Sequence, residues 1–252
     1  MVKGKVRSAD SDHIDLTVHV ITASWSRVHA NTHFLCRSQT TMAALRKQLL
    51  QLAIPLVKSH GFTRQALAES VLCLPQPHQE ILSDTAVSAL FGEGDEARRT
   101  LINAWLDDAR MKMHQSPSRT IKDVLATRLR ENESVLGLLP EAFAVLATPS
   151  NIPVPDSIPG LAHAAKVADE ACRVVGDSTV GPAWYARRGS LAAVYGAAEL
   201  HQLTSPKTAY DFLDNLLDSS TKVESAVADT TQFASYIVKS WAGLIKSRGI
   251  LL

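Results

Sequence analysis

Apolar residues recur at helical spacing from about residue 42 onward, whereas the apolar–polar alternation typical of strands is rare. Leu45, Leu49, Leu52 and Leu56 mark the apolar face of a first helix over residues 42–60. Gly61 supplies its stop signal. We therefore expect an all-α fold. The further predicted helices cover residues 63–72, 83–90, 95–116, 119–147 (with a break at 138–140), 159–175, about 178–202 and 210–218.

The order of elements over residues 42–116 is typical of a helix-turn-helix head. A long helix is followed by His60-Gly61-Phe62-Thr63 and a short helix, and then by a break at Pro75 and Pro77. A second short helix ends at Phe91-Gly92, and a long helix follows. This layout resembles the head of TetR-type regulators and raises a transcriptional regulator with a small-molecule effector as an alternative function.

The charge of this head argues against DNA binding. Residues 65–97 contain no Lys or Arg, and their acidic side chains give a charge of −6 with His78 neutral. A phosphate backbone would repel such a surface, because DNA-reading elements need cations. We therefore predict that the head has the helix arrangement of a DNA-binding domain but lacks the positive charge needed to bind DNA. The acidic residues are Glu69, Glu80, Asp84, Glu93, Asp95 and Glu96.

The segment 176–189 combines helix breakers with a bulky, charged helix start. Trp184, Tyr185, Arg187 and Arg188 open the helix, and Ser178 or Thr179 is expected to cap it. One interpretation is a core helix whose arginines extend to solvent. The other is a partner-binding patch, since Trp, Tyr and Arg dominate many interfaces. Small residues then recur every fourth position, at Gly189, Ala193 and Ala197.

The C-terminal segment 229–252 differs chemically from the rest of the chain. Residues 230–252 contain no Asp or Glu. Apolar and cationic residues predict a membrane-binding amphipathic helix, joined to the core by a small, polar connector at 221–231. A last core helix is the alternative. The predicted membrane-binding residues are Phe233, Ile237, Trp241, Leu244 and Ile245, with Lys239, Lys246 and Arg248.

Residues 1–41 are predicted to be a leader that precedes a helical domain at 42–228. The span 16–68 lacks acidic residues, and residues 17–41 are rich in Ser and Thr, which is typical of a mitochondrial transit peptide. Asp10, Asp12 and Asp15 do not fit that interpretation, so a disordered leader or a wrongly assigned start remains an alternative. His29, His33 and Cys36 have the spacing of metal ligands on a helix, but we expect no metal site there.

Composition and motifs favour a binding protein over an enzyme. The 252 residues carry a net charge of +1, so the overall charge favours neither an anionic nor a cationic binding partner. The three cysteines form no CxxC pattern, and no apolar run is long enough for a transmembrane helix. Glu-x-x-His pairs, phosphate-binding glycine loops, Gly-x-Ser-x-Gly and HExxH are all missing from the sequence. We expect no catalytic residue, metal or cofactor, although an enzyme is a further alternative.

Several sequence blocks carry a resemblance to a known family. They are Gly176-Asp177-Ser178-Thr179, Trp184-Tyr185-Ala186-Arg187-Arg188 and the run from Leu191 to Leu200. His60 to Thr63, Thr127-Arg128-Leu129-Arg130 and the Pro-Ser-Asn-Ile-Pro within 146–153 add to them. Over about residues 42–250 the chain resembles the lipid-binding accessory proteins of ubiquinone (coenzyme Q) biosynthesis.

That resemblance implies a fold and a function. It implies a TetR-like helical bundle that forms homodimers, does not bind nucleic acid and holds a lipid, an isoprenoid quinone intermediate or a phospholipid. It implies a peripheral protein on the matrix side of the mitochondrial inner membrane, bound through the helix at 232–248. Its partners would be the di-iron demethoxyubiquinone hydroxylase and other ubiquinone-synthesis proteins. Trp184 and Tyr185 match the family's hydroxylase-binding patch.

Overall fold

The computed structural model describes residues 42–148, 156 and 158–223, and the chain divides into two compact units, Met1–Gln48 and Leu49–Leu252. In the first unit, the described residues 42–48 are helical. The second unit contains all the elements discussed below. The predicted leader and the whole predicted membrane-binding segment, from Phe233 to Arg248, lie outside the described residues.

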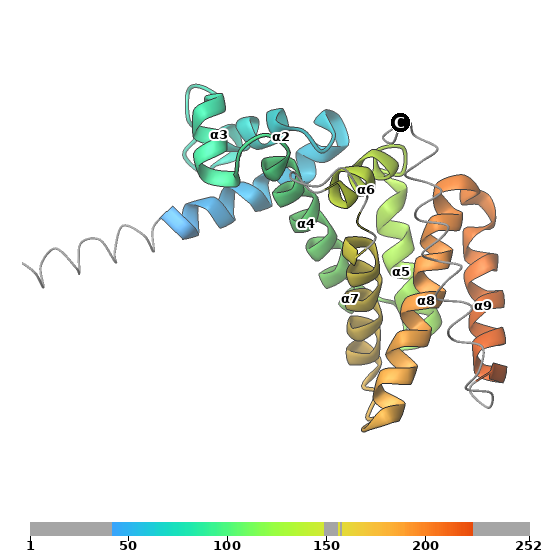
Figure 1. Ribbon diagram of the computed structural model, residues 1–252. Helices are drawn as coiled ribbons and strands as arrows, with labels where there is room; N and C mark the ends of the chain where they lie inside the picture. The colour runs from blue at the N-terminus through green and yellow to red at the C-terminus, as the bar shows by residue number, and fades with distance from the viewer. Residues whose placement is uncertain (1–41, 149–155, 157, 224–252) are drawn as a thin grey trace, which may run out of the picture. The chain divides into compact units, whose positions relative to one another are not determined.

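Four helical segments open the second unit. Helical residues 49–60 are followed by α2 (Arg64–Glu69) with the 3₁₀ turn η1 (Ser70–Cys73), then by α3 (Asp84–Phe91) and α4 (Asp95–Met111) (Figure 1). Side-chain caps define two starts: Thr63 accepts from the amide of Ala66, and Ser83 from the amide of Ala86. The predicted succession of long, short, short and long helices is therefore present.

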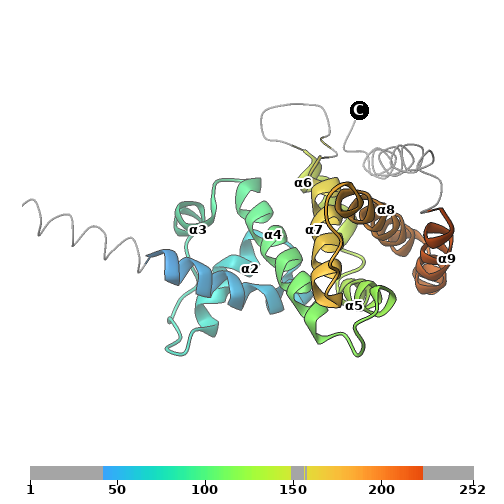
Figure 2. The same cartoon turned by 90° about the horizontal axis from the view of Figure 1, so that it is seen from below.

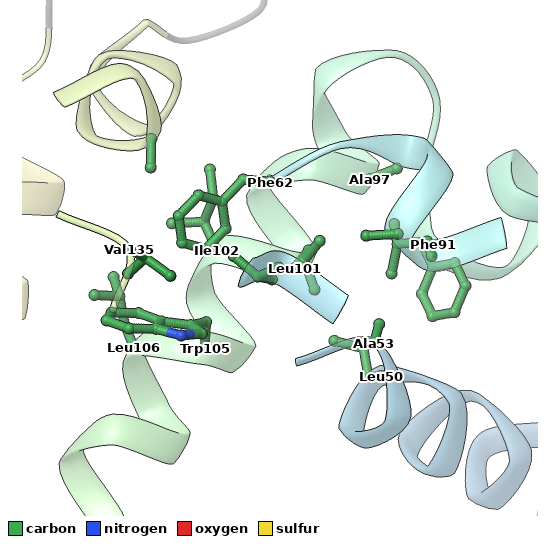
Figure 3. Close-up of a cluster of buried hydrophobic side chains, with 14 of the residues drawn as sticks. Leu50, Ala53, Phe62, Phe91, Ala97, Leu101, Ile102, Trp105, Leu106 and Val135 are labelled. Carbon is green, nitrogen blue, oxygen red and sulfur yellow. The ribbon is translucent and has the colours of Figure 1, made fainter. Parts of the chain in front are cut away.

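An apolar cluster holds these helices together (Figure 3). Trp105 of α4 and Phe62 pack edge to face, with ring centroids 5.8 Å apart. Leu50 and Ala53 reach the same cluster from the first helical segment. Edge-to-face aromatic packing adds to the gain from apolar burial, so this cluster fixes the position of α4. The other labelled residues are Phe91, Ala97, Leu101, Ile102, Leu106 and Val135.

The remaining helices form a bundle in which α7 packs against α8, and α8 against α9 (Figure 1, Figure 2). Its second apolar cluster includes Leu125, Val167 and Leu213, which are fully buried. The elements are η2 (Lys112–Gln115), α5 (Ile121–Glu133), α6 (Leu139–Ala147), α7 (Ile158–Val175), α8 (Pro182–Thr204), η3 (Pro206–Thr208) and α9 (Ala209–Val223).

The all-α class is confirmed, since the described residues contain no strand. The TetR-like assignment stays a prediction. Helix α9 continues to residue 223 and so includes the first residues of the predicted connector. None of the helices in the described ranges is both long and apolar enough to cross a membrane.

The head contains a structural arginine that the charge pattern did not reveal. Arg64 donates from Nε to the Asp84 carboxylate at 2.8 Å and from Nη2 to the hydroxyl of Ser88 at 2.7 Å. Its Nη1 also donates to the carbonyls of Gly92 and Gly94. Arg64 therefore ties α2 to α3 and to the turn before α4, so its cation is engaged within the head.

Candidate functional site

The candidate site lies where α7 passes into α8, at the lower end of these two helices in Figure 1. Gly176 ends α7 with a φ of 74°, a left-handed conformation that glycine adopts without strain. Its amide donates to the Arg173 carbonyl at 3.2 Å, and the Asp177 amide donates to the Cys172 carbonyl at 2.9 Å. This pair of bonds is a Schellman motif, which fixes the backbone of Asp177 at the helix end.

The start of α8 differs from the prediction. Gly181 precedes the helix with a φ of 65°, Pro182 is its first residue, and no side chain caps it. The expected cap by Ser178 or Thr179 is therefore wrong. The Thr179 hydroxyl instead donates to Oδ2 of Asp177 at 2.7 Å, and the Thr179 amide lies 3.3 Å from Oδ1. The Thr179 hydroxyl is therefore bound within the turn and does not cap α8. Pro182 suits the first position of the helix because proline has no amide hydrogen that would need a partner.

Asp177 is the anion at the centre of this turn. Its side chain is only 7% exposed and accepts from Nη1 of Arg188 at 3.3 Å. Nε of Arg187 lies 3.6 Å from its other oxygen. The hydrogen bond from Thr179 is the largest cause that lowers the pKa of Asp177 below its usual value, and the two arginines lower it further. Asp177 is therefore held as a carboxylate by its neighbours.

Arg188 connects this carboxylate turn to the aromatic pair. Its Nε donates to Asp169 of α7 at 2.8 Å, and its guanidinium carbon lies 4.1 Å from the ring centroid of Trp184. Trp184 and Tyr185 pack edge to face, with centroids 4.8 Å apart and an interplanar angle of 76°. We name Trp184, Tyr185 and Arg188 the aromatic platform. Tyr185 is 72% exposed, so the platform presents its ring to solvent.

The structure brings the four predicted partner-binding residues together but divides their roles. Arg188 is largely buried and bound to two aspartates, which matches the structural interpretation. Trp184 is half-buried and Tyr185 exposed, which matches the recognition interpretation. Arg187 is 35% exposed and ion-paired with Asp177. Their role in docking a partner stays a prediction.

The small residues along α8 have unequal surroundings. Ala197 is buried in the core and Ala193 packs partly against it. Gly189 is exposed, and a Cβ built there would meet no heavy atom within 4 Å. Close helix approach therefore does not require glycine at this position, whereas Ala197 does pack closely.

A buried polar cluster lies deeper in the bundle, and the sequence interpretation missed it. Arg128 and Asn132 of α5 and Glu199 of α8 are each 0% exposed. Arg128 Nη1 donates to Asn132 Oδ1 at 2.6 Å, and Asn132 Nδ2 donates to Glu199 Oε1 at 3.1 Å. The Tyr195 hydroxyl donates to the same oxygen at 2.6 Å, and His163 Nε2 of α7 lies 3.3 Å from it. The cluster thus joins α5, α7 and α8.

The cluster keeps Glu199 ionised. Burial alone would raise the pKa of its carboxyl, but His163, Arg128 and the Tyr195 hydroxyl together lower that pKa to about 2. The guanidinium of Arg128 lies 5.4 Å from the Trp105 ring centroid and 6.0 Å from that of Tyr195. Two aromatic rings and one carboxylate therefore surround a buried cation. Arg128 lies one helical turn after Val124 and one after Leu125, and this place among apolar positions was the one available signal.

No group of His, Cys, Asp and Glu side chains in the described part of the chain has the arrangement of a metal site. Most of the polar atoms gathered at the two sites are ion-pair and hydrogen-bond partners of one another. Their arrangement suits binding: the platform presents an exposed aromatic ring, and the buried cluster presents polar atoms inside an apolar bundle.

Comparison with known proteins finds similarity to one family. The COQ9 family model matches residues 158–224, which include α7, the turn with Asp177, the aromatic platform and Glu199. The chain is 28% identical over 193 residues to the ubiquinone biosynthesis protein COQ9, mitochondrial, of Rattus norvegicus. It is 25% identical over 229 residues to the protein of that name from Drosophila melanogaster. The resemblance inferred from the sequence blocks is confirmed.

The extent of these matches differs between relatives. The match to the rat protein covers 70% of this chain and 58% of the relative, and the match to the fruit fly protein covers 84% and 67%. A probable ubiquinone biosynthesis protein coq9, mitochondrial, from Dictyostelium discoideum is 28% identical over 71% of this chain and 60% of its own length. The chain thus spans less than two thirds of the rat and Dictyostelium relatives.

Proposed function

With this resemblance to the COQ9 family as the premise, we propose that the chain is a lipid-binding accessory protein of ubiquinone biosynthesis. It presents isoprenoid quinone intermediates to the di-iron demethoxyubiquinone hydroxylase, as a homodimer on the matrix side of the mitochondrial inner membrane. The names of the relatives support the pathway and the organelle. The observation that carries the proposal is the aromatic platform at the start of α8, which lies inside the segment matched by the family model.

The platform has the properties of a protein-docking site. Tyr185 is 72% exposed although a tyrosine ring gains free energy when it is buried. Val180, in the turn before α8, is a second apolar side chain that solvent reaches, with 81% of it exposed. Arg188 and its two aspartates hold the Trp184 ring in place before any partner arrives. Preorganisation of this kind lowers the entropy lost on binding.

Lipid binding follows from the chemistry of the cargo. A long isoprenoid tail is insoluble in water, and apolar burial stabilises it by about 25 cal/mol per Å² without a charged anchor. An all-α bundle rich in alanine and leucine can supply apolar walls between its helices. The protein then needs one surface for the hydroxylase and one for the membrane, and the predicted helix at 232–248 provides the second.

A pull-down with the hydroxylase tests the docking surface. Trp184→Lys places a second cation beside Arg188 and removes the ring, so we expect hydroxylase capture to fall at least tenfold while the circular dichroism melt stays near that of the unchanged protein. Met111→Lys is the matched control, because Met111 is an apolar side chain on α4 that is 55% exposed. Normal capture by Trp184→Lys would reject this surface.

Native mass spectrometry tests the cargo. Protein purified without detergent should carry an isoprenoid quinone intermediate or a phospholipid. A chain that is free of lipid and also ignores liposomes would contradict the proposal.

Removal of residues 230–252 tests the membrane contact. We expect the shortened protein to lose flotation with liposomes while its helical content and melting temperature are kept. Continued flotation would place the membrane contact elsewhere on the chain.

The two alternatives have their own discriminating measurements. Conversion of a quinone head group by the purified chain, in the absence of the hydroxylase, would identify an enzyme. Salt-sensitive, sequence-dependent DNA binding in a gel shift would identify a regulator. Arg64 speaks against the second, since its guanidinium is bound to Asp84, Ser88 and the turn before α4.

A further inference from the structure

The buried cluster leaves hydrogen-bonding atoms unused. Arg128 Nε, Arg128 Nη2 and Glu199 Oε2 have no hydrogen-bond partner among the described residues, although both side chains are 0% exposed. Buried polar atoms almost always find a partner, because leaving one unpaired costs the free energy of its lost hydration. The three unused atoms therefore indicate a partner that the described residues do not supply.

The unused atoms belong to two side chains that approach each other. Tyr195, Asn132 and His163 all direct their hydrogen bonds to Oε1 of Glu199. His163 Nε2 also lies 3.3 Å from Oε2, but Oε2 accepts no hydrogen bond. Arg128 Nη2 lies 3.9 Å from Oε1, which is too far for a direct bond and close enough for one oxygen atom to bridge the two side chains.

The charge and the hydrogen-bonding pattern select the chemistry of that bridging group. The Arg128 cation is already balanced by the Glu199 anion, so a further ion would stay unpaired in the core. The group must accept from Arg128 and donate to Glu199. A hydroxyl does both, whereas a quinone carbonyl or a methoxy oxygen only accepts and would leave Oε2 unsatisfied.

We propose that Arg128 and Glu199 form a buried site for one neutral hydroxyl oxygen, which accepts from Nε and Nη2 of Arg128 and donates to Oε2 of Glu199. Two molecules carry such an oxygen: water, and a phenol or hydroquinone ring at the head of a bound lipid. The second source rests on the proposed lipid-binding function. It predicts that the protein binds a hydroxyl-bearing ring in preference to the oxidised quinone.

Aromatic side chains around the site suit a ring. The Trp105 ring lies beside the Arg128 guanidinium. The His163 ring is 5.9 Å from that of Tyr195 and 6.1 Å from that of Phe143. Aromatic rings at these separations contact one another, so a bound ring would lie against their edges and faces and not between them. The site thus combines apolar walls with one polar contact that fixes orientation, which is usual for small-molecule sites.

Two measurements on the unchanged full chain test the site. The first is a crystal structure at a resolution that shows ordered water, in which we expect an oxygen within hydrogen-bond distance of both Arg128 and Glu199. The second compares, under anaerobic conditions that keep the hydroquinone reduced, the binding of a decyl-substituted hydroquinone and of the corresponding benzoquinone. We expect the hydroquinone to bind about tenfold more tightly, the effect of one added hydrogen bond.

Replacing both buried charged side chains with apolar ones removes the site without leaving an unpaired charge. Arg128→Met together with Glu199→Leu should bind the two probes equally. The control is Lys122→Met together with Asp214→Leu, which removes an exposed ion pair of 2.7 Å between α5 and α9 and should keep the hydroquinone preference. If the buried double variant does not fold, the two measurements on the unchanged chain still decide.

The outcomes separate the sources and the two proposals. A hydroquinone preference assigns the oxygen to a lipid ring, and an ordered oxygen without that preference assigns it to water. An empty position together with equal binding of both probes overturns the site but leaves the proposed lipid binding intact. An ordered oxygen in a protein that binds neither probe and carries no lipid leaves the site intact and overturns the proposed function.

Discussion

Arg188 stacks on Trp184 one helical turn away, with its guanidinium carbon 4.1 Å from the ring centroid, while Asp169 and Asp177 bind the same guanidinium. The ring is thus held by a cation whose own position is fixed by two anions. Tyr185 is the part of this assembly that solvent reaches. Stability and recognition are therefore assigned to different side chains of one platform, and they can be separated by substitution.

Tyr185→Ala should impair docking without affecting folding. Because the side chain is 72% exposed, we expect the free energy of unfolding to change by less than about 0.5 kcal/mol. Hydroxylase affinity should fall by roughly tenfold or more, as for aromatic residues at the centre of interfaces. Chemical denaturation and a binding titration measure the two effects. Unchanged affinity, with Met111→Ala as the exposed control, would contradict the assignment of Tyr185.

Asp177→Asn should lower stability near neutral pH and change its dependence on pH. The pKa of Asp177 is lowered in the folded protein, chiefly by Thr179, so its carboxylate stabilises the fold above the unfolded pKa near 4, and this contribution is lost as pH falls through the folded value. We expect the variant to lose about 1 kcal/mol at pH 7. The difference from the unchanged protein should shrink in acid.

Denaturant titrations between about pH 7 and pH 2.5 measure that difference, since this window spans the unfolded pKa of an aspartate. Glu93→Gln is the control, since Glu93 is exposed. A difference that stays constant over the whole range would show that Asp177 acts through shape and not through its charge.

Arg128 and Glu199 should show strong coupling in a double-mutant cycle. Arg128→Met alone leaves a buried, unpaired carboxylate, and loss of one partner of such a pair costs about 3–5 kcal/mol. The double variant Arg128→Met, Glu199→Leu should cost less than the sum of the single variants, because no buried charge remains. Urea unfolding of the four proteins gives the coupling energy. Additive effects would mean that the two side chains act independently.

Arg64→Ala should loosen the head. The substitution removes the ion pair with Asp84 and the bond to Ser88, so we expect a loss of about 1–2 kcal/mol. Faster amide hydrogen exchange in α3 would localise the effect. Arg119→Ala is the control, because Arg119 is an exposed arginine outside the head. Exchange that rises equally in both variants would contradict a specific role for Arg64.

Local chemistry explains why the helices were predictable. Apolar spacing, with the stop at Gly61 and the breaks near Gly92 and Gly176, marks elements whose limits depend on neighbouring residues alone. The start of α8 was not predictable in this way. Thr179 is a residue type that often caps helices, but its hydroxyl donates to Asp177. Only the folded turn shows whether the hydroxyl caps the helix or binds this carboxylate.

The buried cluster was not predictable for a different reason. Arg128 and Glu199 lie far apart in the chain, and each lies in a helix whose pattern gives no sign of the other. Charged residues are seldom fully buried, so residue type alone gives no reason to place either side chain in the core. Likewise, nothing next to Arg64 in the sequence indicates its bonds to Asp84 and Ser88, because these form only when α3 packs against α2. The aromatic platform was predictable as a set because its residues are neighbours in the chain.

The way in which Glu199 joins α5, α7 and α8 also limits how this chain can diverge. Asn132 and Tyr195 donate to its carboxylate, and the Arg128 cation balances its charge. Replacement of Arg128 or Glu199 alone leaves the other as an unpaired charge in the core, which destabilises the protein. Evolution must therefore tolerate that unstable intermediate or change both positions together. Descendants should therefore inherit this pair as a unit, even where the surrounding apolar residues drift freely.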